Sequence, residues 1–348
     1  MKCVVKNLLR WIFVAAVFVV PDSSFAQKYS VVDLGPFTNS LSTVSAINNL
    51  GQIAGVLNTN GGYRAVLYGG SWTNLGTLGG SSSFAQGLND ALLVVGRSRL
   101  TNGKVNRAFL WTPGGTNGVA TNPQMKDLGT LGGTAAVAED INTAGQITGY
   151  AQTGSDDHAF RYSDGTMTDI GNLLPSNHNS YASGINDAGH IVGTDYNSAF
   201  NKATAFLYNG STATVLPFPG WTNSYGQAIN NNGQIVGYVS DSANTVNHAF
   251  RYSTSFVDLG TLGGNFSYAF SINNSDIIVG GSYTDANNLI YHAFICMNSS
   301  MMDLNTLLDA SGAGWVLNEA RAINDGGQIA GIGMLNSERH AFLLTKLP

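Results

Sequence analysis

The sequence is poor in cysteine, proline and charge, and each shortage excludes a class of protein. It has 2 cysteines in 348 residues. Cys3 lies in an expected leader, so Cys296 has no internal partner and a disulfide framework is excluded. The 8 prolines and 43 glycines show no collagen period. Only 11% of residues are charged, the net charge is −5 and no basic stripe occurs, which disfavours nucleic-acid binding.

The first 26 residues have the organisation of a signal peptide. Basic residues up to Arg10 precede a ten-residue apolar run, Trp11 to Val20. That run is too short for a membrane-spanning helix, which needs about 20 residues. Small residues at Ser24 and Ala26 suit cleavage after Ala26. We therefore predict a secreted or periplasmic protein without a membrane span after cleavage; the alternative is an uncleaved N-terminal anchor.

A motif recurs seven times along the rest of the chain. It reads Ile-Asn, two turn residues, Gly-Gln-Ile, a small residue and Gly, with some variation. Its Asn is present in every copy, as Asn48, Asn89, Asn142, Asn186, Asn230, Asn273 and Asn324. Successive copies lie 41 to 53 residues apart, so the repeats occupy the whole of 27–348 and leave no room for a second domain.

Each repeat holds four short apolar runs separated by turn residues. In the third repeat they are Ala136 to Asn142, Gln146 to Tyr150, His158 to Tyr162 and Met167 to Gly171. Four strands in a repeat of roughly 40–50 residues are typical of a propeller blade. We predict an all-β fold: a closed seven-bladed β-propeller with four antiparallel strands per blade, in a single domain over 27–348.

The phase of the repeats predicts how the ring closes. The seventh repeat ends with its third run, His340 to Thr345, and lacks a fourth. A spare fourth run, Tyr29 to Gly35, precedes the first repeat. We expect this N-terminal strand to complete the last blade and to remove the open edges that invite aggregation.

The turns carry specific expectations. The repeated Asn is expected to hydrogen-bond the backbone of its own turn, and a calcium ligand is the alternative. Leu92 stands where most copies of this turn have Gly, so the second turn should differ from the others, because Leu tolerates a left-handed backbone poorly. Asp164-Gly165 predicts a two-residue hairpin that pairs Phe160 with Asp169.

A second repeated motif, His-Ala-Phe, raises the question of metal binding. It starts at His158, His248, His292 and His340. One His per blade, away from the axis, is too widely spaced for a shared zinc ion, whose bonds to His nitrogen are about 2.0–2.1 Å. In the predicted register His158 lies diagonal to Asp169, so we expect a His–Asp contact within the blade. We predict neither a metal nor another cofactor.

Together, these motifs resemble the HAF-repeat family of bacterial extracellular repeat proteins. The matching elements are His-Ala-Phe, Ile-Asn-Asp-x-Gly-Gln-Ile-x-Gly and Asp-Leu-Gly-Thr-Leu-Gly-Gly, and the resemblance covers about 29–348. It implies a bacterial, exported protein and supplies no catalytic residues. Arg64, Arg107 and Thr204 replace the His in three copies, so the His residues cannot all perform one chemical task.

No catalytic motif is recognisable, which favours a non-catalytic binding or scaffold protein. Its ligand would be an extracellular or envelope glycan or protein, and we expect a monomer. A polysaccharide-acting enzyme with its site at the propeller mouth, and a structural surface repeat without a ligand, are the alternatives. Irregular connections lie on one face of the ring, and they contain His178, Asn179, Trp221 and Trp315. We predict that these four residues form a ligand site. The competing interpretation is that each Trp fills a gap between blades.

Overall fold

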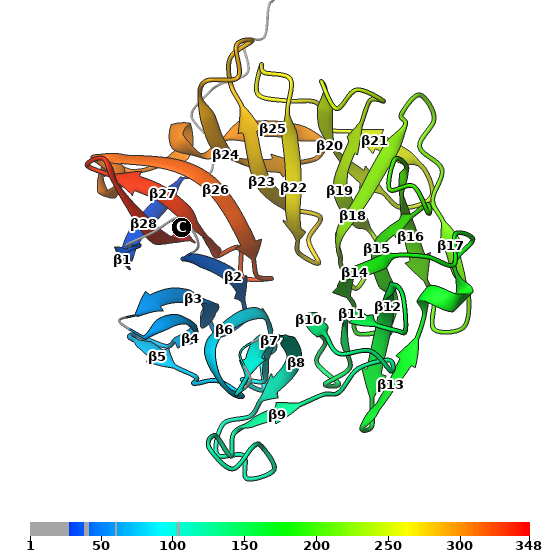
Figure 1. The fold of residues 1–348 in the computed structure, drawn as a ribbon. Helices are drawn as coiled ribbons and strands as arrows, with labels where there is room; N and C mark the ends of the chain where they lie inside the picture. Colours follow the sequence, from blue (N-terminus) through cyan, green and yellow to red (C-terminus); the bar gives the residue numbers. More distant parts are fainter. Residues whose placement is uncertain (1–27, 38–41, 60, 102, 104) are drawn as a thin grey trace, which may run out of the picture.

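The computed structural model describes residues 28–37, 42–59, 61–101, 103 and 105–348. They form seven four-stranded antiparallel sheets arranged as a ring (Figure 1). The predicted all-β propeller of seven blades is therefore confirmed. The predicted signal peptide, 1–26, lies outside the described residues. Among the residues that are described, no helix is long and apolar enough to cross a bilayer.

The strands of each blade run in order from the axis to the rim. The innermost strands are β2 (Thr43–Ile47), β6 (Gly79–Leu88), β10 (Ala136–Ile141), β14 (Ser180–Ile185), β18 (Asn223–Ile229), β22 (Ser267–Ile272) and β26 (Trp315–Ile323). The second strands are β3 (Ile53–Thr59), β7 (Val94–Leu100), β11 (Ile147–Gln152), β15 (Ile191–Tyr196), β19 (Ile235–Ser240), β23 (Ile278–Tyr283) and β27 (Ile329–Leu335).

The outer half of each blade follows the same order. The third strands are β4 (Gly62–Tyr68), β8 (Asn106–Trp111), β12 (Asp157–Ser163), β16 (Ala203–Tyr208), β20 (Asn247–Tyr252), β24 (Tyr291–Met297) and β28 (Glu338–Lys346). The outermost are β5 (Trp72–Asn74), β9 (Met125–Asp127), β13 (Thr166–Asp169), β17 (Ala213–Val215), β21 (Phe256–Asp258), β25 (Ser300–Asp303) and β1 (Tyr29–Pro36). Short 3-10 turns occupy Gly171–Leu173, Leu304–Leu307 and Ala310–Gly312.

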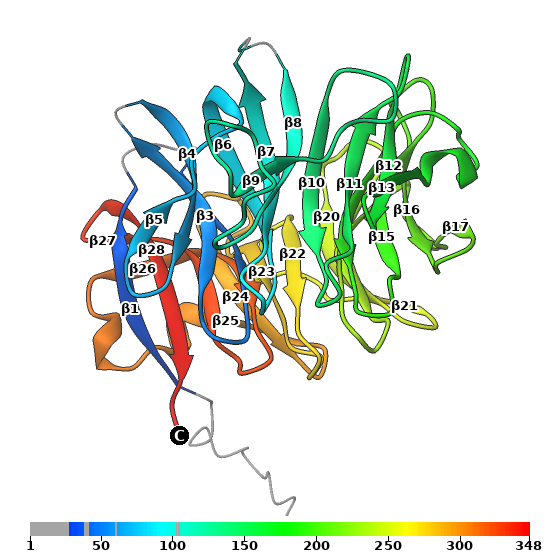
Figure 2. The ribbon, with the colours of Figure 1, turned by 90° about the horizontal axis from the view of Figure 1, so that it is seen from below.

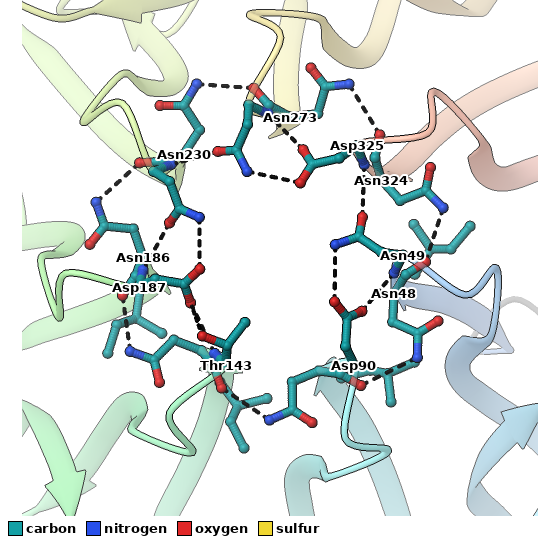
Figure 3. Close-up of a pocket in the computed structure, with 18 of the residues that line it drawn as sticks. Asn48, Asn49, Asp90, Thr143, Asn186, Asp187, Asn230, Asn273, Asn324 and Asp325 are labelled. Atoms are coloured by element: carbon teal, nitrogen blue, oxygen red, sulfur yellow. Dashed lines mark hydrogen bonds between the residues drawn. The ribbon is translucent and has the colours of Figure 1, made fainter.

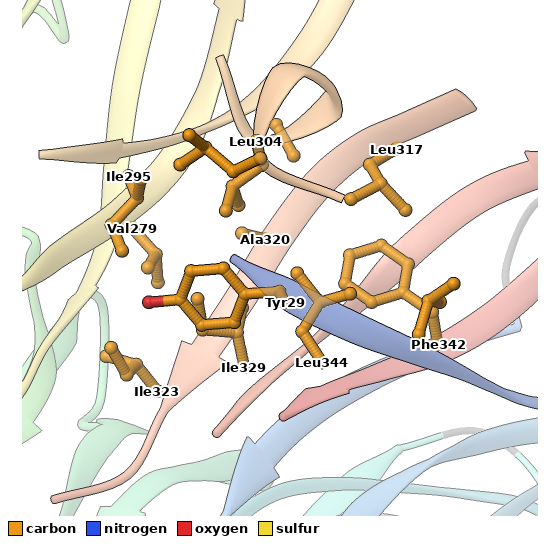
Figure 4. Packing of buried hydrophobic residues seen from close by; sticks show 13 residues of the cluster. Tyr29, Val279, Ile295, Leu304, Leu317, Ala320, Ile323, Ile329, Phe342 and Leu344 are labelled. Carbon is orange, nitrogen blue, oxygen red and sulfur yellow. The ribbon is translucent and has the colours of Figure 1, made fainter. Parts of the chain in front are cut away.

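The first strand of the described chain pairs with the last. β1 runs antiparallel to β28, with Tyr29 opposite Lys346 and Val31 opposite Leu344. Tyr29 is 1% exposed and packs among apolar residues of the last two blades, including Val279 and Leu344 (Figure 4). The seventh blade thus contains strands from both ends of the repeat region.

The closing Gly of the repeated motif lets the inner two strands approach each other closely. Gly237 in β19 lies opposite Phe250 of β20, and that Phe is fully buried. A Cβ atom on Gly237 would lie 1.9 Å from the carbonyl oxygen of Tyr225 in the innermost strand β18. No side chain fits at that distance, so the motif needs Gly here for space. The same close approach occurs at Gly96, Gly149, Gly193, Gly280 and Gly331.

The predicted hairpin and the His–Asp contact are confirmed. Asp164 and Gly165 have φ values of 54° and 81°, and Phe160 pairs with Asp169. The His158 Nδ1 lies 2.9 Å from Asp169 Oδ2. Three other blades repeat the contact, as His248 with Asp258, His292 with Asp303 and His340 with Asp33. Each pair ties the third strand to the outermost strand of one blade.

The expectation that the second turn differs is wrong. Leu92 adopts φ 62°, in the left-handed region, where Gly145 at the equivalent position has φ 77°. The Asn89 side chain holds the turn by accepting hydrogen bonds from the backbone N–H groups of Ala91 and Leu93. The Leu92 side chain also packs against the core of the second blade. These contacts outweigh the strain of about 1–2 kcal/mol.

Candidate functional site

Each innermost strand contains a β-bulge at the same place. In β18, for example, the pairing with β19 shifts between Gly226 and Ala228, so Gln227 is left without a partner. A bulge adds one unpaired residue and re-aims its side chain. The bulge residues of the seven blades are Ser45, Gln86, Glu139, Ser183, Gln227, Phe270 and Arg321.

All seven bulge residues face the axis of the ring. They line a cavity of about 360 Å³ together with Thr43 and Val44. A second cavity of about 190 Å³ has the same seven residues in its wall and extends to Ile47 and Ile323. A third, of about 200 Å³, begins at those isoleucines and opens at the inner turns. The shared walls join the three into one axial channel.

The bulge position is where the blades differ chemically. The residue before the bulge pairs with the repeated Gly, and it is Ala or Gly in six of the seven blades. The bulge residue itself is Ser, Gln, Glu, Ser, Gln, Phe and Arg in turn. The sequence pattern does not single out these residues as a site. In the sequence they differ from the rest of the motif only in that the residue three positions before each repeated Asn varies between repeats. That variation points to a site only when the structure shows that the bulge turns these side chains toward the axis.

Glu139 is the bulge residue with the most perturbed ionisation. Its Oε2 accepts a hydrogen bond of 2.9 Å from Gln86 Nε2. Burial raises the pKa of Glu139 to about 7, even though Gln86 and the charge of Arg97 favour the ionised form. Asp140, next to it, accepts hydrogen bonds from the backbone N–H groups of Ile141 and Ile185. Burial raises the pKa of Asp140 to about 6.

The charge of Arg321 is paired within the seventh blade. Arg321 donates a hydrogen bond of 2.6 Å from its Nε to Glu319 Oε2. Its guanidinium also lies over the ring of Phe270, 5.0 Å from the centroid. This ion pair and cation–π contact hold Arg321 against the channel wall.

A continuous arc of aromatic rings spans the third to the sixth blade on one face of the ring. We call it the tyrosine belt; its members are Tyr150, Tyr181, Tyr196, Tyr225, Tyr238 and Tyr268. Successive ring centroids lie 4.8, 5.6, 6.4, 4.4 and 4.9 Å apart, and every ring is half-buried. The belt lies where the innermost strands begin and the second strands end. In Figure 2 this face is at the top of the view, opposite the C-terminus.

The repeated Asn residues surround the other end of the channel. Each side-chain amide donates to the backbone carbonyl of the equivalent Asn in the next blade (Figure 3). The distances run from 3.0 to 3.3 Å. The predicted bonds within the turn are also present, since Asn142 Oδ1 accepts from the N–H of Gln146 at 2.9 Å. The Asn therefore joins neighbouring blades as well as shaping its turn.

The four residues predicted to form a ligand site lie on the belt face, away from the axial cavities. His178 is 44% exposed in its side chain, and Asn179 Oδ1 accepts a hydrogen bond of 2.9 Å from the N–H of Asp157. Trp221 and Trp315 are half-buried and pack beside His248 and His340, with ring centroids 5.1 and 6.0 Å apart. The structure brings His178 and Asn179 together and places each Trp in another blade.

Metal binding and thiol chemistry depend on His, Cys, Asp and Glu side chains. Across the described ranges, no group of three His, Cys, Asp or Glu side chains is placed to hold a metal ion. Cys296 is buried, and burial raises the pKa of its thiol to about 11. The thiol is therefore protonated at neutral pH and is a poor nucleophile.

No family model matches this sequence, and no curated protein sequence matches it. Solved structures share its fold. The β-propeller domain of the Trilobed protease from Pyrococcus furiosus is 10% identical with a TM-score of 0.50, covering 76% of this chain and 81% of that one. A puromycin-hydrolysing peptidase of Mycobacterium tuberculosis is 11% identical with a TM-score of 0.51, and the Pyrococcus horikoshii acylaminoacyl peptidase is 9% identical with 0.50.

These likenesses concern the fold alone. The match covers 88% of this chain in both peptidases but only 52% of either peptidase, so the chain spans about half of their length. Identities near 10% show a β-propeller and carry no activity across.

Proposed function

We propose that this chain is an exported, non-catalytic binding protein of the HAF-repeat type, which holds a cell-envelope glycan at the belt end of its axial channel. The observation that carries the proposal is the ring of bulge residues. Seven blades built on one repeat pattern keep their turns and cores while they present seven side chains of five residue types to one cavity. A rigid frame with variable convergent groups is the usual construction of a binding site.

The tyrosine belt supports a glycan as the ligand class. Tyr rings offer an apolar face and a polar tip, and they lose little conformational entropy when they bind. The bulge residues deeper in the channel add hydroxyl and amide groups, from Ser45, Ser183, Gln86 and Gln227. Such a combination suits a sugar, which has apolar ring faces and a rim of hydroxyl groups.

A substitution that fills the channel tests the site. Ser183→Trp should occupy the cavity and abolish binding on a glycan array, because the channel then lacks room for a sugar. Ser255→Trp is the matched control, since Ser255 is exposed on the turn before β21, away from the axis. Equal binding by both variants, with unchanged melting, would contradict the proposal.

An enzyme acting on polysaccharides is the second candidate, favoured by one observation. A carboxyl with a pKa near 7 is what a general acid requires, and Glu139 has one. A glycosidase also needs a second carboxylate. Asp140, next to Glu139 in the sequence, is less suited to that role because its oxygens already accept hydrogen bonds from two backbone N–H groups. Release of reducing ends from wall glycans by the protein, and its loss in Glu139→Gln, would favour the enzyme.

Three further features belong to the proposal. We expect 27–348 to act as one monomeric domain that is secreted or periplasmic after cleavage near Ala26. We expect the pairing of β1 with β28 to close the ring against edge-to-edge association. His178, Asn179, Trp221 and Trp315 form a proposed secondary contact for a ligand that extends beyond the channel.

A further inference from the structure

We infer that the belt face also binds a basic polypeptide segment, whose apolar side chains cover the exposed Phe200, Leu289 and Ile290. These residues lie in connections between second and third strands, outside the axial channel. The surface is therefore separate from the proposed glycan site. Three features point to it: the distribution of exposed apolar residues, the order of the loop that carries two of them, and the charges beside them.

Exposed apolar residues in the connections of the described chain gather on the belt face. Phe200 is 55% exposed and Leu289 80%, and Leu173 and Ile290 are also exposed there. On the opposite face Leu50 is exposed in an inner turn. Three more exposed residues lie within strands, namely Val32, Val215 and Val316. Single exposed apolar residues need no explanation, whereas their concentration on one face marks an interaction site.

The loop that carries Leu289 and Ile290 is held by one carboxylate. Asp285 Oδ1 accepts hydrogen bonds of 2.9 Å from the N–H groups of both residues. Its Oδ2 accepts another, of 3.1 Å, from the N–H of Asn287. The N–H of Asn288 donates to the carbonyl of Asp285, which closes the turn. The two apolar side chains therefore project from an ordered turn, so a partner that covers them loses little loop entropy.

Aromatic rings connect Phe200 with the sixth blade. The Phe200 ring lies 5.7 Å from the ring of Tyr196, a member of the tyrosine belt. From Tyr196 the belt continues to Tyr225, Tyr238 and Tyr268 with centroid distances of 6.4, 4.4 and 4.9 Å. Tyr rings are favoured in protein interfaces because they offer a large apolar face and a polar tip.

The belt also reaches the loop of the sixth blade. Tyr268 pairs with Gly281 on the neighbouring strand β23. A Cβ atom on Gly281 would lie 2.3 Å from the hydroxyl oxygen of Tyr291, so Tyr291 packs directly on that Gly. Tyr291 follows Ile290 in the chain. Phe200 and Ile290 thus flank one continuous aromatic surface.

The connections of this sector are acidic. Between the repeated Gly and the His-Ala-Phe position, the third to sixth blades contain one cation, Lys202, and five carboxylates. The carboxylates are Asp156, Asp157, Asp195, Asp241 and Asp285. Asp195 is buried and accepts a hydrogen bond from Ser176, and the other four are partly exposed. Hydrogen bonds from Thr245 lower the pKa of Asp241, and those from the N–H groups of Ile290 and Leu289 lower the pKa of Asp285, so both are ionised at neutral pH.

Other charged groups of these four blades do not neutralise the sector. His178 lies 3.9 Å from Asp156. The outer-strand carboxylates are each paired with a His of their own blade, and they are Asp169, Asp258 and Asp303. Arg161 lies near the inner turn at Gly189, on the opposite face, and Arg251 pairs with Asp276. The cation within the acidic connections therefore remains Lys202.

The remaining blades carry the opposite charge in the same connections. Among the described residues they contain one carboxylate, Glu338, and five cations: Arg64, Arg97, Arg99, Arg107 and Arg339. Arg107 is paired with Asp127. The belt face is thus acidic on the side that exposes Phe200, Leu289 and Ile290. A basic polypeptide is attracted to that side, and an anionic lipid surface is repelled by it.

Fluorescence anisotropy with three labelled peptides of equal length tests the inference. The first contains Leu and Phe among Lys and Ser residues, the second has Glu in place of each Lys, and the third has Ser in place of each Leu and Phe. We expect the first to bind at least about tenfold more tightly than either of the others. Raising the salt concentration should weaken its binding, because salt screens the attraction between exposed charges.

Exposed leucines on opposite faces supply matched variants. Leu289→Ser combined with Ile290→Ser should weaken binding of the first peptide at least about tenfold, and so should Phe200→Ser. Leu50→Ser removes a leucine that is 70% exposed on the opposite face and should leave binding unchanged. These side chains are exposed, so all variants should melt as the native protein does. If the double variant fails to fold, Phe200→Ser decides.

Several results would overturn the inference. They are equal binding of the Lys and Glu peptides, binding that survives in the variants of the belt face, and absence of binding of the first peptide. Binding of phosphatidylcholine vesicles, or concentration-dependent dimerisation, that is lost in the same variants would also overturn it, because the face would then serve a membrane or a second copy. Glycan binding in the channel is measured separately with Ser183→Trp, so either proposal can fail alone.

Discussion

The side-chain amide of Asn324 in the last blade donates a hydrogen bond of 3.0 Å to the backbone carbonyl of Asn48 in the first. The two residues are 276 positions apart in the sequence. This bond completes a cycle of seven that links every blade to the next at one end of the channel. Each Asn is nearly fully buried, so its hydrogen bonds are shielded from water.

Removing one bond of the Asn cycle should destabilise the ring. In Asn186→Ala, the carbonyl of Asn230 loses one of its two donors and the N–H of His190 loses its acceptor. We expect the free energy of unfolding to fall by about 2–3 kcal/mol, because a buried bond between blades is lost and a turn N–H is left unpaired. Urea unfolding measures the change. Asn231→Ala, on the exposed neighbouring position, is the control and should cost less than about 1 kcal/mol.

Adding one methyl group at the repeated Gly should be strongly destabilising. In Gly237→Ala the new Cβ would lie 1.9 Å from the carbonyl oxygen of Tyr225, so the two strands must separate. We expect a loss of about 3 kcal/mol or more in the same assay. Gly154→Ala has no atom within 4 Å of its new Cβ and should be nearly neutral. Similar costs at the two positions would contradict the close-packing explanation.

Glu139 should make stability depend on pH. Its pKa of about 7 in the folded state exceeds the ordinary value of 4.5. The folded state therefore binds more protons than the unfolded state between these values, and stability falls as pH rises through about 7. Glu139→Gln should raise stability at pH 8 by about 2 kcal/mol and have little effect near pH 4. Melting curves at both pH values provide the check; an equal effect at the two would refute it.

The two Trp residues should contribute to stability as well as to any rim contact. Both are half-buried against apolar clusters. We expect Trp221→Ala and Trp315→Ala to lower the free energy of unfolding by about 2 kcal/mol each. Truncating a fully buried aromatic residue costs more, about 3–5 kcal/mol. Glycan binding should survive at the channel and weaken for long chains only. Complete loss of short-chain binding at full stability would move the primary site to the rim.

Deleting residues 27–36 tests how the ring closes. The deletion removes β1, leaves β28 as an unpaired edge and takes the buried ring of Tyr29 out of the core. We expect a lower melting temperature and association through the free edge, seen by size-exclusion chromatography. The control is the chain that starts at Gln27. A monomeric deletion variant with unchanged melting would show that β1 is dispensable.

The sequence alone determined the architecture and much of the detail within each blade. Seven copies of one motif imply seven blades, because a repeat unit that cannot bury its own apolar face must stack on its neighbours. Asp164-Gly165 set the register that places His158 beside Asp169, since a two-residue hairpin allows one pairing. These features depend on residues close together in the chain.

The tertiary structure decided what the blades do to one another. The bond from Asn324 to Asn48, the tyrosine belt and the convergence of Glu139 with Gln86 all join residues of different repeats. The conformation of Leu92 was likewise settled by packing against its neighbours rather than by local preference. A repeated pattern specifies the unit, whereas ring curvature and the bulge decide which side chain of each unit reaches the axis. That is why the channel residues follow from the fold and not from the motif.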